Sequence, residues 1–75
     1  MNNNVTVYTR TGCTACHATT RYLDKNSIAY TEVTADDPDV VDDLKAHGFL
    51  SLPVVQTTDD TWTGFRLDKL RSLAA

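Results

Sequence analysis

The sequence predicts an α/β fold in which the elements follow the order βαβαββα and form a four-stranded mixed sheet flanked by three helices. An early strand, helix, strand succession is typical of a crossover that joins two parallel strands. Two later strands around a tight turn indicate an antiparallel hairpin. Three segments carry apolar residues at helical spacing, and helices of this kind cover the faces of such a sheet.

The length and composition of the chain limit it to one unit. Its 75 residues are 41% apolar and 23% charged. A chain this short buries only about 60% of the surface that its unfolded form exposes, so it has room for one core. It lacks the low hydrophobicity of a disordered segment. We therefore expect residues 1–75 to form a single domain.

The first strand is predicted over residues 5–9, where β-branched and aromatic side chains alternate between two faces. A short turn follows, and apolar side chains then recur at helical spacing over residues 15–23. This amphipathic helix should begin at or just after Cys13. We expect Asn26 to end it in the left-handed conformation, as asparagine often does. A second strand over residues 28–33 should pair with the first in parallel.

The second helix has clear start and stop signals. Asp37 followed by Pro38 places an N-cap residue before a proline at the first helical position. Gly48 is suited to the left-handed conformation that closes many helices, and Phe49 can make the accompanying hydrophobic contact. We therefore expect this helix to lie between Asp37 and Gly48.

The last third of the chain predicts a hairpin and a third helix. Strands are expected over residues 54–57 and 61–64, with the polar residues 58–60 forming the turn. Residues 66–74 carry leucines and alanine at helical spacing. This segment completes the βαβαββα order.

Charge and hydropathy exclude several classes of partner. The net charge is -3 and the isoelectric point is about 5.0, whereas binding to phosphates depends on clustered lysine and arginine. The seven basic residues are scattered along the chain. No basic segment followed by an apolar one marks the chain for export, and no long apolar stretch is present. We expect a cytoplasmic protein that binds neither nucleic acid nor membrane.

The candidate site is the pair Cys13 and Cys16, at the start of the first helix. In a reducing cytosol such a pair is more often catalytic or metal-binding than structural. The unpaired N–H groups and the positive end of the helix dipole favour a thiolate in the first turn. We therefore expect Cys13 to be the nucleophile, and Cys16, on the apolar face, to resolve the mixed disulfide. Arg10 can add to the stabilisation of the thiolate.

The same residues leave other hypotheses open. Residues 13–17 satisfy the C-x-x-C-H pattern of covalent haem attachment, although that chemistry usually accompanies export and Met1 is the only methionine. With His17 and His47 the cysteines supply the four donors of a structural zinc site, but without its usual paired spacing. An inert disulfide would close too short a loop to stabilise the fold much. Two unconnected buried cysteines are the simplest alternative.

Two stretches resemble a known family. Residues 8–10 leading into residues 13–19, and the later residues 62–68 with the run Trp-Thr-Gly-Phe-Arg, resemble the NrdH-redoxins. These belong to the glutaredoxin-like branch of the thioredoxin fold and are the hydrogen donors of class Ib ribonucleotide reductase. The resemblance implies a dithiol–disulfide oxidoreductase that delivers electrons to that enzyme and is reduced by thioredoxin reductase with NADPH. It implies a monomer that requires no metal, haem or bound nucleotide.

The resemblance also implies further site residues. Pro53 should follow a cis peptide bond beside Cys13, leaving the backbone of Leu52 free to pair with an extended substrate segment. In the family the residue at Trp62 belongs to the surface near the active site, although a core or half-buried aromatic on the last strand explains Trp62 by itself. We expect Trp62 and Phe65 to be partly structural, with contacts to a partner as a hypothesis. The remaining partner contacts expected are two residues that precede the cysteine pair, Arg10 and Thr11.

Three other functions are alternatives to the hypothesis of an NrdH-like oxidoreductase. The nearest is a glutathione-dependent glutaredoxin, but the Gly-Gly and acidic signature that binds glutathione is missing where residues 63–66 stand. A c-type cytochrome would follow from the C-x-x-C-H match. The third is a protein-binding module without catalytic activity.

Overall fold

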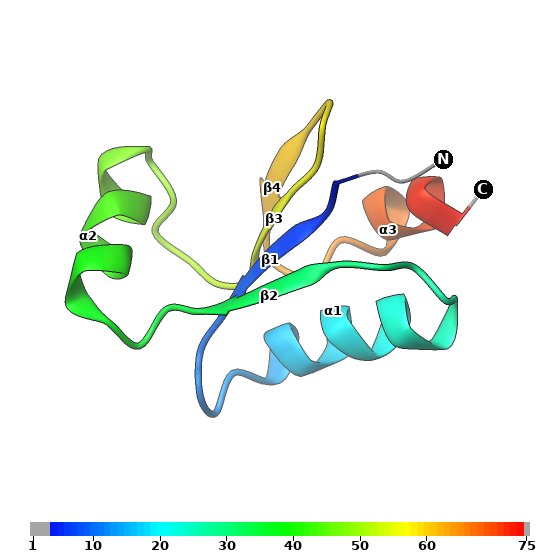
Figure 1. The fold of residues 1–75 in the computed structure, drawn as a ribbon, viewed down its shortest axis with the longest axis horizontal. Coiled ribbons are helices and arrows are strands. Elements are labelled where there is room, and N and C mark those ends of the chain that lie inside the picture. The colour runs from blue at the N-terminus through cyan, green and yellow to red at the C-terminus, as the bar shows by residue number, and fades with distance from the viewer. Residues whose placement is uncertain (1–3, 75) are drawn as a thin grey trace.

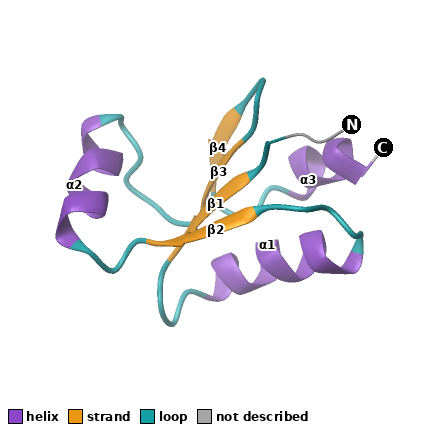
Figure 2. Cartoon of the chain, in the orientation of Figure 1, coloured by secondary structure: helices purple, strands orange, loops and turns teal. Residues whose placement is uncertain are grey.

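The computed structural model describes residues 4–74 and contains the seven expected elements in the expected order (Figures 1 and 2). The strands are β1 (Thr6–Thr9), β2 (Thr31–Thr34), β3 (Val54–Gln56) and β4 (Thr61–Thr63). The helices are α1 (Thr14–Lys25), α2 (Pro38–Ala46) and α3 (Leu67–Ala74). Within residues 4–74 no helix has the length and apolarity needed to cross a membrane.

The four strands form one mixed sheet with the order β2-β1-β3-β4. β1 pairs with β2 in parallel and with β3 in antiparallel orientation, and β3 and β4 form the antiparallel hairpin. The register places Val7 of β1 beside Val55 of β3, and Val55 beside Trp62 of β4. The fold class predicted from the sequence, a thioredoxin fold with three helices around a four-stranded mixed sheet, is confirmed.

The two faces of the sheet bury different clusters. On the face toward α1 and α3, the buried side chains are Val5, Val7, Leu23, Val55, Trp62 and Leu70. On the other face, toward α2, Ala35, Leu44 and Val54 are buried, and the side chains around them are only partly covered. Figure 1 shows α2 standing apart from α1 and α3. The first face therefore holds the denser core.

The second helix begins and ends as its sequence signals predict. The carboxylate of Asp37 accepts a hydrogen bond from the backbone N–H of Asp39 at 2.9 Å, which caps the N-terminus of α2. At the other end Gly48 has a φ of 86°, and the N–H of Phe49 donates to the carbonyl of Leu44 at 2.9 Å. This turn directs the chain back toward the sheet.

The connection between α1 and β2 differs from the sequence prediction. β2 begins at Thr31 and not at Ile28, because the N–H of Ile28 still donates to the carbonyl of Leu23 and closes the helix end. Asn26 has a φ of -101°, and Ser27, with a φ of 56°, takes the left-handed conformation. The expected left-handed Asn26 is therefore wrong by one position. Its side chain instead donates to the carbonyl of Tyr22 at 2.8 Å.

Candidate active site

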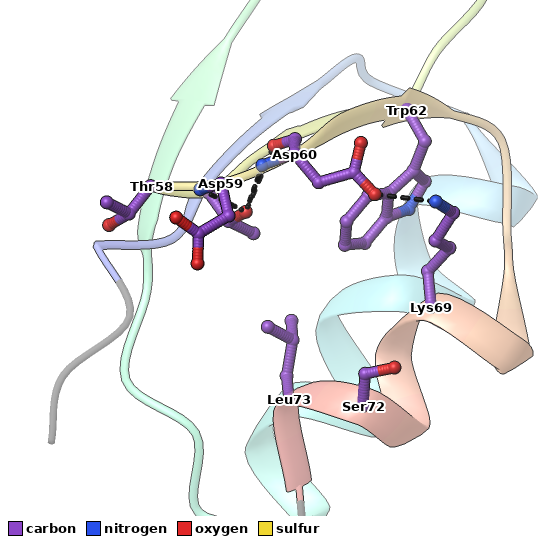
Figure 3. A pocket seen from close by; sticks show the side chains of 8 residues that line it. Thr58, Asp59, Asp60, Trp62, Lys69, Ser72 and Leu73 are labelled. Carbon is purple, nitrogen blue, oxygen red and sulfur yellow. Dashed lines mark hydrogen bonds and ion pairs between the residues drawn. The ribbon is translucent and has the colours of Figure 1, made fainter.

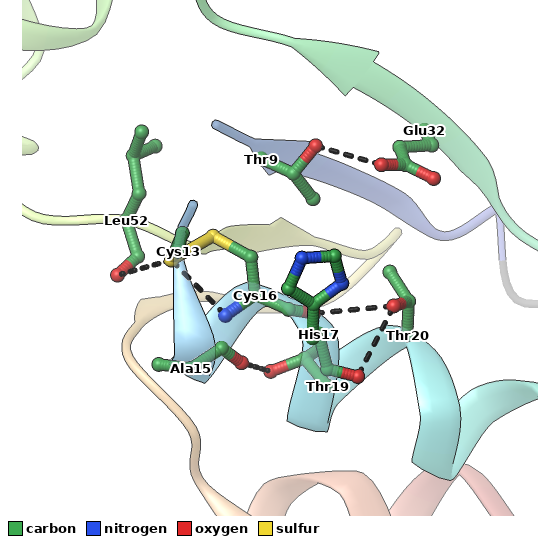
Figure 4. The surroundings of a disulfide bond; sticks show 9 residues. All are labelled: Thr9, Cys13, Ala15, Cys16, His17, Thr19, Thr20, Glu32 and Leu52. Atoms are coloured by element: carbon green, nitrogen blue, oxygen red, sulfur yellow. Dashed lines mark hydrogen bonds between the residues drawn. A yellow bond between two sulfur atoms is a disulfide. The ribbon is translucent and has the colours of Figure 1, made fainter. Parts of the chain in front are cut away.

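Cys13 caps α1 with its own sulfur. Its backbone is extended, with φ -87° and ψ 109°, and its Sγ accepts a hydrogen bond from the backbone N–H of Cys16 at 3.1 Å. The two sulfurs are joined in a disulfide whose Cα atoms lie 5.2 Å apart (Figure 4). The prediction that the helix starts directly after Cys13 is confirmed.

The two cysteines differ in exposure. Cys13 is partly exposed, whereas Cys16 is 2% exposed beneath it on the inward side of α1. A partner disulfide can therefore reach the sulfur of Cys13 more readily than that of Cys16. The asymmetry follows from their positions, because Cys13 is the N-cap outside the first turn, whereas Cys16 lies within α1 among its buried residues.

Two polar groups face the sulfur of Cys13, and they act in opposite directions on a negative charge. The N–H of Cys16 lies 3.1 Å from Sγ and favours a thiolate, while the carbonyl oxygen of Leu52 lies 3.9 Å from Sγ and disfavours one. The N–H is nearer and belongs to the positive end of the helix dipole.

Leu52 and Pro53 lie where the resemblance implied. The Leu52–Pro53 peptide bond is cis, and the approach of the Leu52 carbonyl to Sγ places this turn beside Cys13. Pro53 is buried, and its carbonyl accepts a hydrogen bond from the N–H of Gly64 at 2.8 Å. The end of β4 thus holds the turn against the cysteine pair.

A groove of about 460 Å³ opens beside Cys13 on the side of α2. It combines two cationic side chains with apolar ones, among them Leu50, which is 80% exposed. Its lining residues are Arg10, Cys13, Ala35, Val41, Leu44, Lys45, Phe49, Leu50, Ser51 and Leu52. Lys45 and Leu50 were not predicted as site residues; the one available signal was the apolar run that begins with Phe49 and Leu50 after the helix-ending Gly48.

Arg10 and Thr11 lie on the turn before the cysteine pair. The N–H of Cys13 donates to the carbonyl of Arg10 at 3.2 Å, which tightens this turn. The hydroxyl of Thr11 donates to the carboxylate of Asp36 at 3.0 Å, and Arg10 lines the groove. Thr11 therefore ties the turn to the segment after β2, a role that the sequence did not indicate.

Trp62 and Phe65 lie in different environments. Trp62 is 7% exposed in the core between the sheet and α3, so its side chain has the expected structural role and does not take the surface position that the resemblance implied. Side chains alternate along β4, and this alternation turns Trp62 toward α3. The alternative interpretation of Trp62 as a core aromatic therefore describes its position. Phe65 is 42% exposed and follows Gly64, whose N–H is bonded to Pro53.

The histidines that the sequence offered as metal ligands do not assemble a site. His17 is exposed on the first turn of α1, and His47 is the C-cap of α2, where its ring nitrogen lies 2.8 Å from the carbonyl oxygen of Asp43. Among residues 4–74 no three histidine, cysteine or acidic side chains come together in a group that could hold a metal ion.

The chain is similar to one known family and, over nearly its whole length, to several known proteins. The profile of the glutaredoxin family matches residues 5–62. The glutaredoxin-like protein NrdH of Salmonella typhimurium is 42% identical over 71 residues, covering 93% of this chain and 88% of the relative. The protein of the same name from Lactococcus lactis subsp. cremoris is 34% identical over 71 residues, covering 93% of this chain and 99% of the relative.

Solved structures give the same result. The NrdH-redoxin of Escherichia coli, described as glutaredoxin-like with a thioredoxin-like activity profile, superposes with a TM-score of 0.88 at 38% identity, covering 93% of each chain. Glutaredoxin 1 of Francisella tularensis superposes with a TM-score of 0.68 at 25% identity, covering 95% of this chain and 91% of the other. The sequence and structural comparisons agree on one family.

Proposed function

The chain belongs to the glutaredoxin family as an NrdH-like thiol–disulfide oxidoreductase, and from this premise we propose that it reduces class Ib ribonucleotide reductase and is itself reduced by thioredoxin reductase. The observation that carries the proposal is the sulfur of Cys13, which caps α1 and borders an open groove while Cys16 lies buried behind it. We further propose that residues 1–75 act as a single-domain monomer in the cytoplasm.

The first step is attack by the Cys13 thiolate on one sulfur of the acceptor disulfide. A new bond forms between that sulfur and Sγ of Cys13, and the acceptor's second sulfur leaves as a thiolate that takes up a proton. The N–H of Cys16 holds the attacking sulfur at the groove. The role of this N–H is to favour the ionised form, because only a thiolate is an effective nucleophile.

The second step releases the reduced acceptor. Cys16 gives up its proton and attacks Sγ of Cys13, which forms the disulfide seen in the structure and expels the acceptor's first sulfur as a thiol after protonation. Two electrons have then passed from the cysteine pair to the acceptor. The burial of Cys16 supports its role as the resolving residue, since it can bond to Sγ of Cys13 beside it but is shielded from an acceptor disulfide in solution.

The partner contacts of the proposal lie around the groove. An extended acceptor segment would lie along the backbone of Leu52, which lines the groove and is held in place by the cis bond to the buried Pro53. Arg10 supplies a positive charge on the same side, while Thr11 holds the turn. Phe65 adds an exposed aromatic surface beyond Pro53.

The reductant of the proposal is thioredoxin reductase, which would supply electrons from NADPH. The alternative reductant is glutathione, as in other glutaredoxins. The run of residues 63–66 in place of a Gly-Gly and acidic signature favours the reductase. Family membership accounts for the C-x-x-C-H run without covalent haem attachment.

The test is a reductant comparison on the oxidised protein. Thioredoxin reductase with NADPH should reduce it efficiently. Reduced glutathione, at a concentration that supplies the same number of electrons, should not. Each mixture is then coupled to turnover of a class Ib ribonucleotide reductase. Efficient turnover with glutathione alone would contradict the proposed reductant, and failure to support the reductase would contradict the proposed acceptor.

A further inference from the structure

A second cavity lies at the end of the sheet opposite the disulfide, between the β3–β4 turn and α3 (Figure 3). Thr6, at the start of β1, pairs with Gln56 beside this turn, whereas Cys13 follows the end of β1. The cavity has a volume of about 340 Å³ and is lined by Thr57, Thr58, Asp59, Asp60, Trp62, Lys69, Ser72 and Leu73. It is therefore separate from the groove beside Cys13.

One wall of the cavity carries an unsatisfied hydrogen-bond donor. The indole of Trp62 is 7% exposed, and its Nε1–H finds no acceptor among residues 4–74. A buried donor without a partner is costly, and such groups are rare in folded proteins. The nitrogen is itself closed to solvent, so an acceptor atom of a ligand in this cavity reaches the N–H only when the side chains that cover it move aside.

The ammonium of Lys69 covers the same wall. Its Nζ lies 5.9 Å from the centre of the Trp62 ring and pairs with the carboxylate of Asp60. Figure 3 shows the indole nitrogen on the edge of the ring that faces Lys69. The side chains of Lys69 and Asp60 are 36% and 44% exposed, and an ion pair this accessible contributes little to stability. Lys69 can therefore turn from Asp60 to a ligand at small cost.

The charges around the cavity select the class of ligand. Trp62 and Lys69 offer hydrogen-bond donors on one side, and the carboxylate of Asp59 lies on the turn opposite. A simple anion would be repelled by Asp59 and Asp60 in a chain of net charge -3. A simple cation would leave the Trp62 N–H without an acceptor. Leu73 provides an apolar surface between the two sides.

We propose that this cavity binds a small zwitterionic amino acid with an apolar side chain. Its carboxylate accepts hydrogen bonds from Nε1–H of Trp62 and from Lys69, and its ammonium pairs with Asp59. Its side chain packs between the indole and Leu73. This site does not depend on the redox function, because it lies at the other end of the sheet.

The indole N–H resonance of Trp62 reports binding directly, because Trp62 is the only tryptophan in the chain. Leucine is the probe, added to the uniformly ¹⁵N-labelled full-length protein. The resonance should shift saturably with a dissociation constant of about 1 mM, a value reasonable for so small a ligand. Leucinamide lacks the carboxylate and N-acetylleucine lacks the ammonium, so each should bind at least about tenfold more weakly.

Two variants and a control complete the test. Asp59→Asn and Lys69→Met should each weaken leucine binding at least about fivefold, and Arg71→Met, on the exposed last turn of α3, should leave it unchanged. Unaltered amide spectra of the variants outside the cavity show that the fold is kept. A shift that fails to saturate, equal shifts with the three probes, or full binding by Asp59→Asn would each overturn the proposal.

Discussion

The two faces of the sheet are packed to different degrees. Toward α1 and α3, the residues Val7, Leu23, Val55 and Leu70 are each 0% exposed. Toward α2, the packing depends on side chains that remain partly exposed, and the groove beside Cys13 opens among them. The first face therefore supplies most of the stability, and the second leaves surface for an acceptor.

This difference has a physical reason. A chain of 75 residues buries a smaller share of its surface than a longer chain does, and this one has three helices to divide between two faces. Helices α1 and α3 share one face, while the short α2 and the segment that follows it cover the other alone. The incompletely covered face is where the loops bring the reactive sulfur and the turn at Pro53 together.

The largest expected effect is a loss of activity, without a loss of stability, when Cys13 is replaced. Cys13→Ser should lower disulfide reduction by more than about 1,000-fold, because the hydroxyl is a far weaker nucleophile at neutral pH. Serine is also a preferred N-cap residue, so α1 should keep its start and the protein its unfolding temperature. NADPH-coupled reduction of insulin disulfides measures the first quantity, and circular dichroism measures the second.

Cys16→Ser is the matched variant for the buried sulfur. It should retain the first step and accumulate a mixed disulfide between Cys13 and the acceptor, which mass spectrometry of the intact adduct detects. Reversed behaviour, with loss of the first step in Cys16→Ser and trapping in Cys13→Ser, would exchange the proposed roles.

The second effect measures the denser face. Leu70→Ala should lower the free energy of unfolding by about 2–5 kcal/mol, because the buried side chain leaves a cavity. The same substitution at Leu50, which is 80% exposed, should change it by less than about 0.5 kcal/mol. Urea unfolding followed by circular dichroism compares the two variants. Equal losses at Leu70 and Leu50 would contradict the assignment of stability to the first face.

The third effect tests the open face as a docking surface. Leu50→Ala should raise the KM for a protein acceptor about tenfold, which corresponds to about 1.4 kcal/mol, while reduction of a small soluble disulfide stays unchanged. The small disulfide serves as the control because it needs only the sulfur of Cys13. An unchanged KM for the protein acceptor would remove Leu50 from the contact.

The smallest expected effect is a change in how the stability of the protein depends on pH, caused by two exposed ion pairs at α3. A hydrogen bond from Lys69 lowers the pKa of Asp60, and one from Arg66 lowers the pKa of Asp68, both from the ordinary value of 3.8. Because these pKa values are lower in the folded state, their stabilisation is complete above about pH 4 and is lost as the pH falls through the folded-state values. Lys69→Met should reduce the loss of stability in urea unfolding between about pH 4 and pH 2. Arg71→Met should not.

Most of the fold could be predicted from the sequence, because the signals that start and end its helices and strands lie in short stretches of the chain. The proline and aspartate at the start of α2, the glycine after its end and the alternation of the strands each depend on a few neighbouring residues. The start of β2 was misplaced because Ile28 and Tyr30 have the composition of a strand but pack against the core from a loop. Composition alone does not distinguish these two arrangements.

The site was predictable only in part. Spacing identified the cysteine pair, and the resemblance supplied the cis bond before Pro53. The groove brings Lys45 of α2 and Leu50 of the following segment onto the same lining as Cys13, although they lie far from it in the sequence. The burial of Trp62 depends on which face α3 covers, and this is a tertiary property that alternation along β4 leaves open.

The sulfur that caps α1 links the state of the helix end to the progress of the reaction. In the proposed mechanism the cap of the reduced protein is a thiolate, which accepts the hydrogen bond of the Cys16 N–H more strongly than a neutral sulfur does. When Cys13 bonds to an acceptor it loses this charge, and the first turn of α1, which carries Cys16, is held less tightly. The amide hydrogen of Cys16 should then exchange with solvent faster in the mixed disulfide than in the thiolate. In the proposed mechanism, the helix end would therefore be more mobile in the same intermediate in which Cys16 attacks Cys13.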